Sequence, residues 1–290
     1  MKPSKSAYDR VTERIIDLLE QGVCPWRRPW QILNIRPQNF ASRHEYSGVN
    51  LFLLNAMAFQ APLFMTFKQV RDKGGQIIKG SKGFPVVYWG TIRVEDEHAQ
   101  SEKNRTKEIP FLKHFTVFNA AQIEGIDFPT PEPRNQTEFQ PILAADQIVT
   151  RWEDRPEIRE DRGRACYNPL IDVVDMPNQS SFISPQEYYS TLFHELGHST
   201  GARHRLNRKF GKRFGDNHYS REELIAEMTS AFLCAECGID NSVINNQAAY
   251  LSGWIKTLKG DSKLVVNAAS AAQKAANLIL GNVETESKAA

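Results

Sequence analysis

The sequence constrains the fold most strongly at residues 184–201, where SPQEYYSTLFHELGHSTG is predicted to form one long helix. Ser184 can cap its N-terminus, Pro185 suits the first helical turn, and Gly201 can end it. Apolar residues recur along one side of the segment, as expected for a helix that packs against a core. Any fold of this chain must therefore bury one side of a long, well-capped helix in its C-terminal half.

The same helix carries the pattern H-E-x-x-H at His194, Glu195 and His198. Residues four apart lie one turn apart, so both imidazoles lie on one face and can bind a single ion. Glu195 beside them can hold a water molecule and take its proton. The pattern predicts a metal-dependent peptidase site, with Zn²⁺ as the expected ion and Mn²⁺ as the alternative.

Two residues compete for the role of third metal ligand. His204 completes the spelling H-E-x-x-H-x-x-G-x-x-H, in which a glycine brings a third histidine to the ion. Glu223, in EELIAE, would instead bind the metal from a second helix, with Glu227 one turn later orienting a histidine. We favour Glu223, because Met228 lies within a helical run and not in the methionine-containing turn that the His204 pattern requires.

A peptidase also needs groups that align and polarise its substrate. The segment IDVVDMP precedes the predicted active helix, and we expect it to supply an edge strand for a peptide. Tyr167, Tyr188 and His218 are candidate donors to the oxyanion, and the sequence does not choose between them.

The chain divides at a proline-rich segment, DFPTPEPRNQTEFQP, at residues 127–141. We interpret it as a linker between domains at residues 1–126 and 142–290. Residues 1–125 contain 18 Lys and Arg against 12 Asp and Glu, whereas residues 126–290 contain 18 against 22. The basic first half and acidic second half predict different partners.

The predicted elements mix helices and strands in both parts. In the first part, helices are expected over 8–21, 48–59 and 66–75, followed by strands in IIKGSKGFPVVYWGTIRVED and HFTVFNAAQI. The polar segment EHAQSEKNRTKE between those strands reads as a hairpin loop. The fold class is therefore α+β, in two domains.

The first part combines cations with flat rings, as a binder of single-stranded nucleic acid requires. The residues expected to contact DNA are Trp26, Arg27, Arg28, Trp30, Lys68, Lys79 and Lys82. The alternatives are that the rings pack in the core and that the lysines form a solvated face.

The N-terminal segment is charged and amphipathic, and no apolar run is long enough to span a bilayer. We therefore expect a cytoplasmic protein without a membrane partner. Cys234 and Cys237 form a C-x-x-C within an apolar helical run, and we expect them to pack inside the protein.

The order of motifs resembles the ArdC-type antirestriction proteins of conjugative plasmids. The likeness rests in the first part on QGVCPWRRPW, YSGVN, FMTFKQV, GGQIIKGSKG, VVYW and FTVFNAAQI. In the second part it rests on YNPLIDVVDMP, FHELGHSTG, RLNR and EELIAEMTSAFLCAECGI.

The resemblance implies a single-stranded-DNA-binding domain joined to a zincin-like metallopeptidase domain, which together shield incoming plasmid DNA from host restriction enzymes. It also supports Glu223 over His204, because RLNR in that family often follows a residue other than histidine. Two other functions remain open: a DNA-coating protein with an inert zincin scaffold, and a cytosolic metallopeptidase without a DNA role. For the antirestriction peptidase and for the metallopeptidase without a DNA role, the sequence does not identify the protein or peptide substrate.

Overall fold

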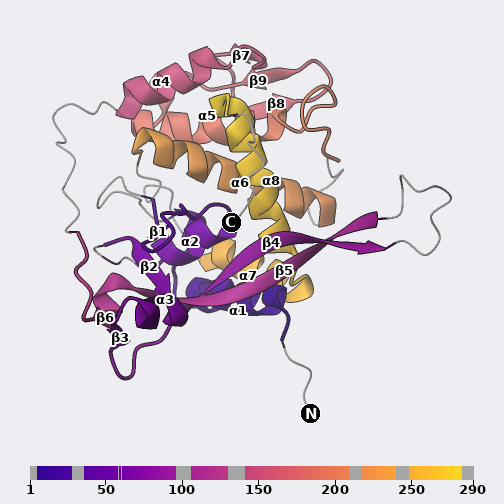
Figure 1. Cartoon of the computed structure of the whole chain (residues 1–290). Coiled ribbons are helices and arrows are strands. Elements are labelled where there is room, and N and C mark those ends of the chain that lie inside the picture. The colour runs from indigo at the N-terminus through magenta and orange to yellow at the C-terminus, as the bar shows by residue number, and fades with distance from the viewer. Residues whose placement is uncertain are drawn as a thin grey trace.

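A computed structural model of the chain describes residues 5–27, 36–57, 59, 61–95, 106–129, 141–209, 217–239 and 248–282. The fold is α+β with two domains, as the sequence predicted (Figure 1). The first half contains α1 (Ala7–Glu20), the short turn η1 (Pro25–Arg27), α2 (Val49–Asn55) and α3 (Phe67–Asp72). Its strands are β1 (Gln38–Asn39), β2 (Leu63–Thr66), β3 (Gln76–Ile77), β4 (Phe84–Glu95), β5 (Thr106–Asn119) and β6 (Ile123–Glu124).

The helices of the second half are α4 (Pro141–Arg151), α5 (Pro185–Ser199), α6 (Asn217–Cys237), α7 (Ala248–Gly260) and α8 (Leu264–Leu280). Its strands are β7 (Glu157–Arg159), β8 (Cys166–Asn168) and β9 (Val173–Asp175). No helix among the described residues is long and apolar enough to cross a bilayer.

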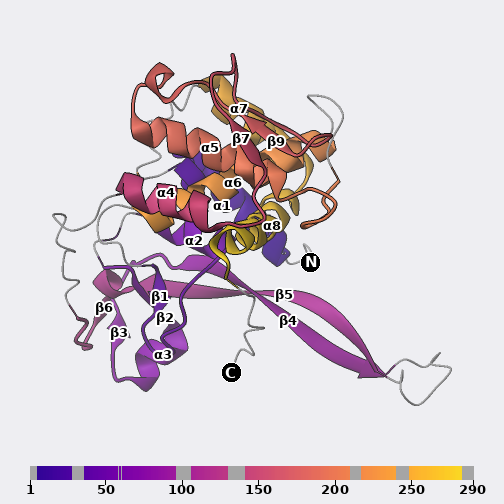
Figure 2. The same cartoon turned by 90° about the horizontal axis from the view of Figure 1, so that it is seen from above.

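The main sheet of the first half has the strand order β1-β2-β5-β4. Strands β4 and β5 form a long antiparallel hairpin whose register runs from Phe84↔Val117 to Glu95↔Thr106. The outer part of this hairpin extends away from the helices as an arm (Figures 1 and 2). The strands expected in IIKGSKG and after it are present, but β3 pairs with β6 and not with β4. Of the polar segment expected as the hairpin loop, 97–108, residues 97–105 lie outside the described residues, whereas residues 106–108 already belong to β5.

The sheet of the second half has the order β7-β9-β8, so β9 is its central strand. This order corrects the expectation that IDVVDMP would be an edge strand, because Val173–Asp175 pairs on both sides. The edge strand next to the helix with the H-E-x-x-H motif is β8, which packs against α5.

One hydrophobic core joins the two halves of the chain. It contains α1, η1 and α2 side chains together with those of α6, α7 and α8. The rings of Phe52 and Phe232 stack at 4.7 Å between centroids, and Trp26 meets Trp254 edge-on at 6.1 Å. Most of the expected linker, 130–140, lies outside the described residues, but the regions on either side of it pack together over a common core.

The two cysteines of the C-x-x-C motif lie inside this core, where Cys234 and Cys237 are both 0% exposed. Neither is joined in a disulfide. Burial raises the pKa of the Cys237 thiol, which keeps it protonated and unreactive. The prediction of helix packing for these residues is confirmed.

Candidate metal centre

Helix α5 presents the two histidines of the H-E-x-x-H motif. It begins where the Ser184 hydroxyl accepts a hydrogen bond from the backbone N–H of Glu187 at 3.2 Å, with Pro185 in the first turn. One turn separates His194 and His198, and their Nε2 atoms lie 3.1 Å apart. The predicted pairing of the imidazoles on one helix face is therefore present.

Helix α6 brings a carboxylate to these two rings. Its Glu223 places Oε2 3.6 Å from Nε2 of His194 and Oε1 3.6 Å from Nε2 of His198. The three candidate ligand atoms lie within 4.8 Å of one another. Two imidazole nitrogens and a carboxylate oxygen are donors that suit Zn²⁺ or Mn²⁺, so these residues fit a divalent metal ion.

The close approach of α5 and α6 depends on Gly197. A Cβ atom at this position would lie 3.1 Å from Cα of Ala226 and 3.2 Å from Cβ of Thr229. A methyl group here would require the neighbouring helix to shift by a few tenths of an ångström, so glycine favours the close approach that brings Glu223 to the histidines.

The charges around His194 favour a cation at this place. Burial lowers the pKa of His194, whereas the Glu223 carboxylate beside it raises the pKa. The negative charges of Glu195 and Glu227 raise it further, and the net pKa lies above its usual value. A positive charge is therefore stabilised here, whether a proton or a metal ion carries it.

Glu195 is nearly buried and is fixed by the neighbouring edge strand. It is 9% exposed, and its Oε2 accepts a hydrogen bond from the backbone N–H of Tyr167 in β8 at 2.8 Å. This contact fixes the Glu195 carboxylate against β8, close enough to His194 for its charge to act on that ring.

The strand that holds Glu195 is itself braced by Arg205. The Tyr167 hydroxyl donates to Asp172 at 2.9 Å, and the guanidinium of Arg205 makes two hydrogen bonds of 2.8 Å to the same carboxylate. The Arg205 side chain is 1% exposed. Paired contacts between a guanidinium and a carboxylate fix direction as well as distance, so they orient the β8–β9 turn.

Arg208, the last residue of RLNR, braces the other side of the cluster. It donates to both carboxylate oxygens of Glu222, at 3.0 and 2.7 Å, and to the backbone oxygen of Gly197 at 2.8 Å. Glu222 Oε1 lies 3.5 Å from Nδ1 of His198, the ring nitrogen that faces away from the cluster. A carboxylate at this nitrogen orients a metal-binding imidazole and increases its basicity.

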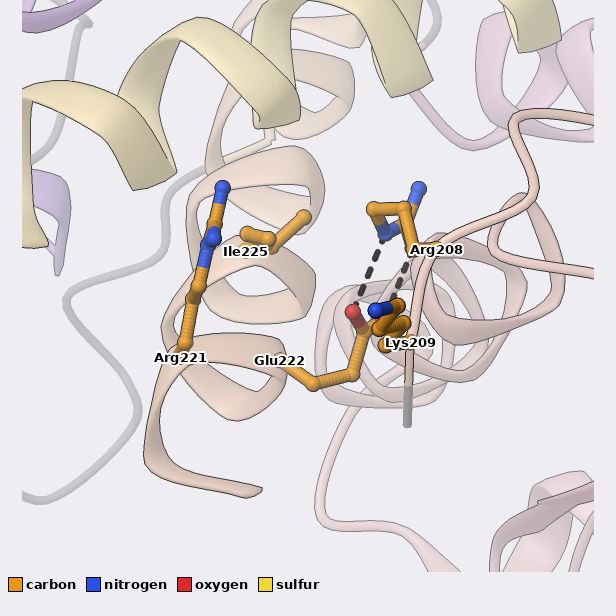
Figure 3. A pocket seen from close by; sticks show the side chains of 5 residues that line it. All are labelled: Arg208, Lys209, Arg221, Glu222 and Ile225. Carbon is orange, nitrogen blue, oxygen red and sulfur yellow. Dashed lines mark hydrogen bonds and ion pairs between the residues drawn. The ribbon is translucent and has the colours of Figure 1, made fainter. Parts of the chain in front are cut away.

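Figure 3 shows the contact between Arg208 and Glu222 in the lining of a neighbouring pocket of about 140 Å³. Dashed lines join Arg208 to Glu222, while Arg221 stands on the other side of Ile225. Arg208 therefore lies behind His198, where its positive charge is paired with the carboxylate of Glu222.

Glu227 has partners from distant parts of the chain. Its Oε2 accepts hydrogen bonds from the indole Nε1 of Trp26, at 3.3 Å, and from the hydroxyl of Tyr250. It adds negative charge next to His194, but the carboxylate that contacts His198 Nδ1 is that of Glu222.

His204 lies away from the three clustered ligands. Its side chain is 54% exposed, and its Nε2 lies 3.6 Å from Asp172 Oδ2. Among the described residues, the group that could hold a metal ion contains Glu223 and not His204.

Among the three candidate oxyanion donors, two are occupied elsewhere. The Tyr167 hydroxyl bonds to Asp172, and the Tyr188 hydroxyl donates to Glu160 at 2.9 Å. Burial and the Glu160 carboxylate raise the pKa of Tyr188 to about 12. The side chain of His218 lies outside the described residues.

The structure places the residues expected to contact DNA in different environments. Trp26 is 1% exposed and lies in the shared core, so the prediction that its ring stacks on a base is wrong. Its neighbours Arg28 and Trp30 lie outside the described residues, as does the side chain of Arg27. The exposed residues of the set are Lys68, Lys79 and Lys82, around α3 and the turn before β4.

Comparison with known proteins matches each half of the chain to a protein family. A model of the N-terminal domain of anti-restriction factor ArdC matches residues 5–118, and a zincin-like metallopeptidase model matches residues 144–271. The metal-free crystal structure of the antirestriction ArdC protein from plasmid R388 is 38% identical and superposes with a TM-score of 0.72. The match covers 95% of this chain and 97% of that one. The chain belongs to the ArdC family.

Other relatives of this ArdC-type chain include one protein of similar length and two that are much longer. An uncharacterized protein of Sinorhizobium fredii, y4eC, is 33% identical over 280 residues, which span 93% of this chain and 90% of the relative. Two DNA primases named TraC from Escherichia coli are also 33% identical, but the match spans only 27% and 20% of their lengths. The Mn(II)-bound form of the R388 protein superposes with a TM-score of 0.71 at 36% identity.

Sequence reasoning missed several residues of the ArdC-type site. Glu222 and Arg208 escaped notice, although E-E at 222–223 and the RLNR motif were visible. Adjacent residues on a helix point about 100° apart, so the sequence could not show that Glu222 would reach the back of His198 while Glu223 reached the front.

Proposed function

We propose that this ArdC-type chain is a metal-dependent peptidase that also binds single-stranded DNA and protects incoming plasmid DNA from restriction. The observation that carries the peptidase proposal is the cluster of His194, His198 and Glu223 beside the buried carboxylate of Glu195. We place its action in the cytoplasm, where restriction of entering DNA takes place.

In this proposal His194, His198 and Glu223 hold the metal ion, and Glu222 orients His198. A bound Zn²⁺ or Mn²⁺ would act as a Lewis acid toward the peptide carbonyl and lower the pKa of water. Zinc is the expected ion, and the Mn(II) form of the R388 relative makes manganese the alternative to test.

Glu195 is the proposed general base, because its carboxylate is held next to the cluster by the Tyr167 backbone. Strand β8 pairs with β9 on one side, and its Tyr167 N–H faces Glu195 on the other. An extended peptide that lies along this side of β8 would therefore pass directly beside Glu195.

The DNA-binding part of the proposal is supported by the match of residues 5–118 to the ArdC N-terminal domain and by the exposed Lys68, Lys79 and Lys82. Arg27, Arg28 and Trp30 remain proposed contacts. Phosphate contacts from lysine and arginine would make binding fall steeply with salt.

A Glu195→Gln variant tests the proposal, because it keeps the shape of the side chain and removes the base. Conjugation into a restricting host measures protection, and mass spectrometry of metal-loaded protein incubated with restriction-enzyme subunits and oligo(dT) measures cleavage. The wild type should protect and produce new peptides, and the variant should do neither while still binding metal and DNA. Full protection by the variant would leave a DNA-coating protein with an inert scaffold. Cleavage by a wild type that binds no DNA would leave a peptidase without a DNA role.

A further inference from the structure

The β4–β5 arm has two chemically different faces. Side chains alternate along each strand, and the register pairs Tyr88 with Lys113 and Gly90 with Phe111. The intervening residues point to the other face, where Trp89 meets Tyr8 of α1 edge-on at 6.1 Å. We call the face away from α1 the open face; its residues are Tyr88, Gly90, Ile92, Ile109, Phe111, Lys113 and Phe115.

The open face exposes large apolar side chains. Tyr88 is 39% exposed, Ile92 47%, Ile109 40% and Phe115 46%. These four lie on two paired strands, so they form one patch, unlike isolated surface residues. A contiguous exposed apolar patch of this kind marks an interaction site.

A glycine sets the position of two rings on this face. The rings of Tyr88 and Phe111 lie 6.5 Å apart between centroids. A Cβ at Gly90 would lie 2.5 Å from Cζ of Phe111 and 3.0 Å from Cε1 of Tyr88. Glycine weakens a strand, but here it lets both rings lie over the backbone and close together, with Tyr88 exposed and Phe111 half-buried.

The charge of the open face favours an anionic partner. The Lys113 ammonium lies 5.0 Å from the centre of the Phe111 ring. Within residues 84–94 and 108–119, the one carboxylate is Glu108, which lies on the opposite face and pairs with Arg93 at 2.9 Å. The open face therefore combines rings with a cation and carries no negative charge in this part of the hairpin.

We propose that the open face is a platform on which single-stranded DNA stacks, with bases on Tyr88, Phe111 and Phe115 and a phosphate at Lys113. Bases of a single strand can present their flat faces to such rings, whereas bases of a duplex are already stacked and paired. This proposal rests on the DNA-binding function proposed above and replaces the buried Trp26 as the source of stacking rings.

Fluorescence anisotropy of a labelled oligo(dT), with the full chain, tests the platform. Tyr88→Leu and Phe115→Leu keep apolar bulk but remove the rings, and the double variant should bind about tenfold or more weakly. Its salt slope should stay unchanged. Lys113→Ala should reduce the slope by about 0.7, the value for one phosphate contact on a single strand.

Two variants on the opposite face serve as matched controls. Trp89→Leu removes a ring and Arg93→Ala removes a cation, so both should bind nearly as the wild type does. The melting temperature of each variant shows that the fold is retained. Equal losses in the control and open-face variants would overturn the platform, since the hairpin as a whole would then be responsible.

The outcomes separate this proposal from the one on which it rests. A wild type that does not bind oligo(dT), or binds duplex as tightly, would refute DNA binding of this kind altogether. A wild type that binds oligo(dT) while the Tyr88→Leu, Phe115→Leu double variant binds equally well would refute only the platform and return the site to Lys68, Lys79 and Lys82.

Discussion

The indole nitrogen of Trp26 lies 3.3 Å from a carboxylate oxygen of Glu227, one helical turn after Glu223. The first part of the chain thus contacts the helix that supplies the proposed third metal ligand. The same oxygen accepts a bond from Tyr250 of α7, so Glu227 is held by two residues from opposite ends of the sequence.

Replacing Trp26 by Phe should lower metal affinity by up to about tenfold, because it keeps an aromatic core residue but removes the N–H that holds Glu227. Zinc affinity is measured by competition with a fluorescent chelator. Trp254→Phe is the control, since Trp254 packs against Trp26 and has no hydrogen bond to Glu227 among the described contacts. Equal affinities in the wild type and the Trp26 variant would show that this hydrogen bond does not support the metal centre.

Glu223→Ala should remove most of the bound metal, as should loss of either histidine. A site with three protein ligands that loses one keeps only two imidazoles and solvent. His204→Ala should retain metal, because its exposed ring faces Asp172. Glu227→Ala should lie between them, with affinity lowered by about 10- to 100-fold. Metal analysis of the purified proteins decides the order, and an empty His204 variant beside a full Glu223 variant would reverse our assignment.

Gly197→Ala should weaken metal binding without touching a ligand. Its new methyl group would press on Ala226 and Thr229, which separates α5 from α6 and draws Glu223 away from the histidines. Overpacking of this kind costs about 1–3 kcal/mol in the free energy of unfolding. Gly253→Ala in α7 is the matched control, because nothing lies within 4 Å of its Cβ position. If both variants bind zinc alike, the close helix contact is not what positions Glu223.

Asp172→Asn should destabilise the protein by about 2 kcal/mol near pH 7, because the buried Arg205 loses a charged partner. Asparagine still tolerates the positive φ of 53° at this position. Asp154→Asn is the control, as its exposed carboxylate should contribute below about 1 kcal/mol. Urea unfolding of both variants measures the difference.

The effect of Asp172 should also depend on pH. Burial raises the pKa of Asp172, but hydrogen bonds from Arg205 and Tyr167 outweigh it and hold the pKa below its usual value. A depressed pKa stabilises the fold above the unfolded-state pKa of about 3.9, and the contribution disappears as the pH falls through the folded-state value. The wild type should therefore lose its advantage over Asp172→Asn only below about pH 4. An advantage that already disappears at pH 6 would point to another group.

Local signals in the sequence were enough to predict that His194 and His198 lie on one face of a helix. The Ser184 cap and the spacing of His194 and His198 determine the helix and the paired imidazoles within a few turns of chain. Contacts between distant segments were not predictable in this way. Trp26 looked like a ring for stacking on bases, but its partners are Glu227, Tyr250 and Trp254, more than 200 residues later. Helices α7 and α8 carried no motif and were not anticipated, although they complete the core.

That core also predicts that the first part does not fold alone. A fragment of residues 1–126 would expose Phe52, which packs on α6, and the α1 side chains that pack on α7 and α8, so it should be largely unfolded by circular dichroism. For the same reason a chelator should lower the stability of the whole chain in one transition. A fragment with a cooperative melt of its own would show that the shared core is dispensable for the first part.

The packing of α1 and α2 on α6, α7 and α8 also fixes the distance between the base of the β4–β5 arm and the candidate metal ligands. The base of the β4–β5 arm and the helices that carry His194 and Glu223 cannot change their separation without opening the core between them. A strand of DNA that binds near the base of the arm would therefore keep a constant distance and direction from Glu195. Which protein is cut would then follow from where that protein sits along the strand, and the amino acids around the cleaved bond would matter less.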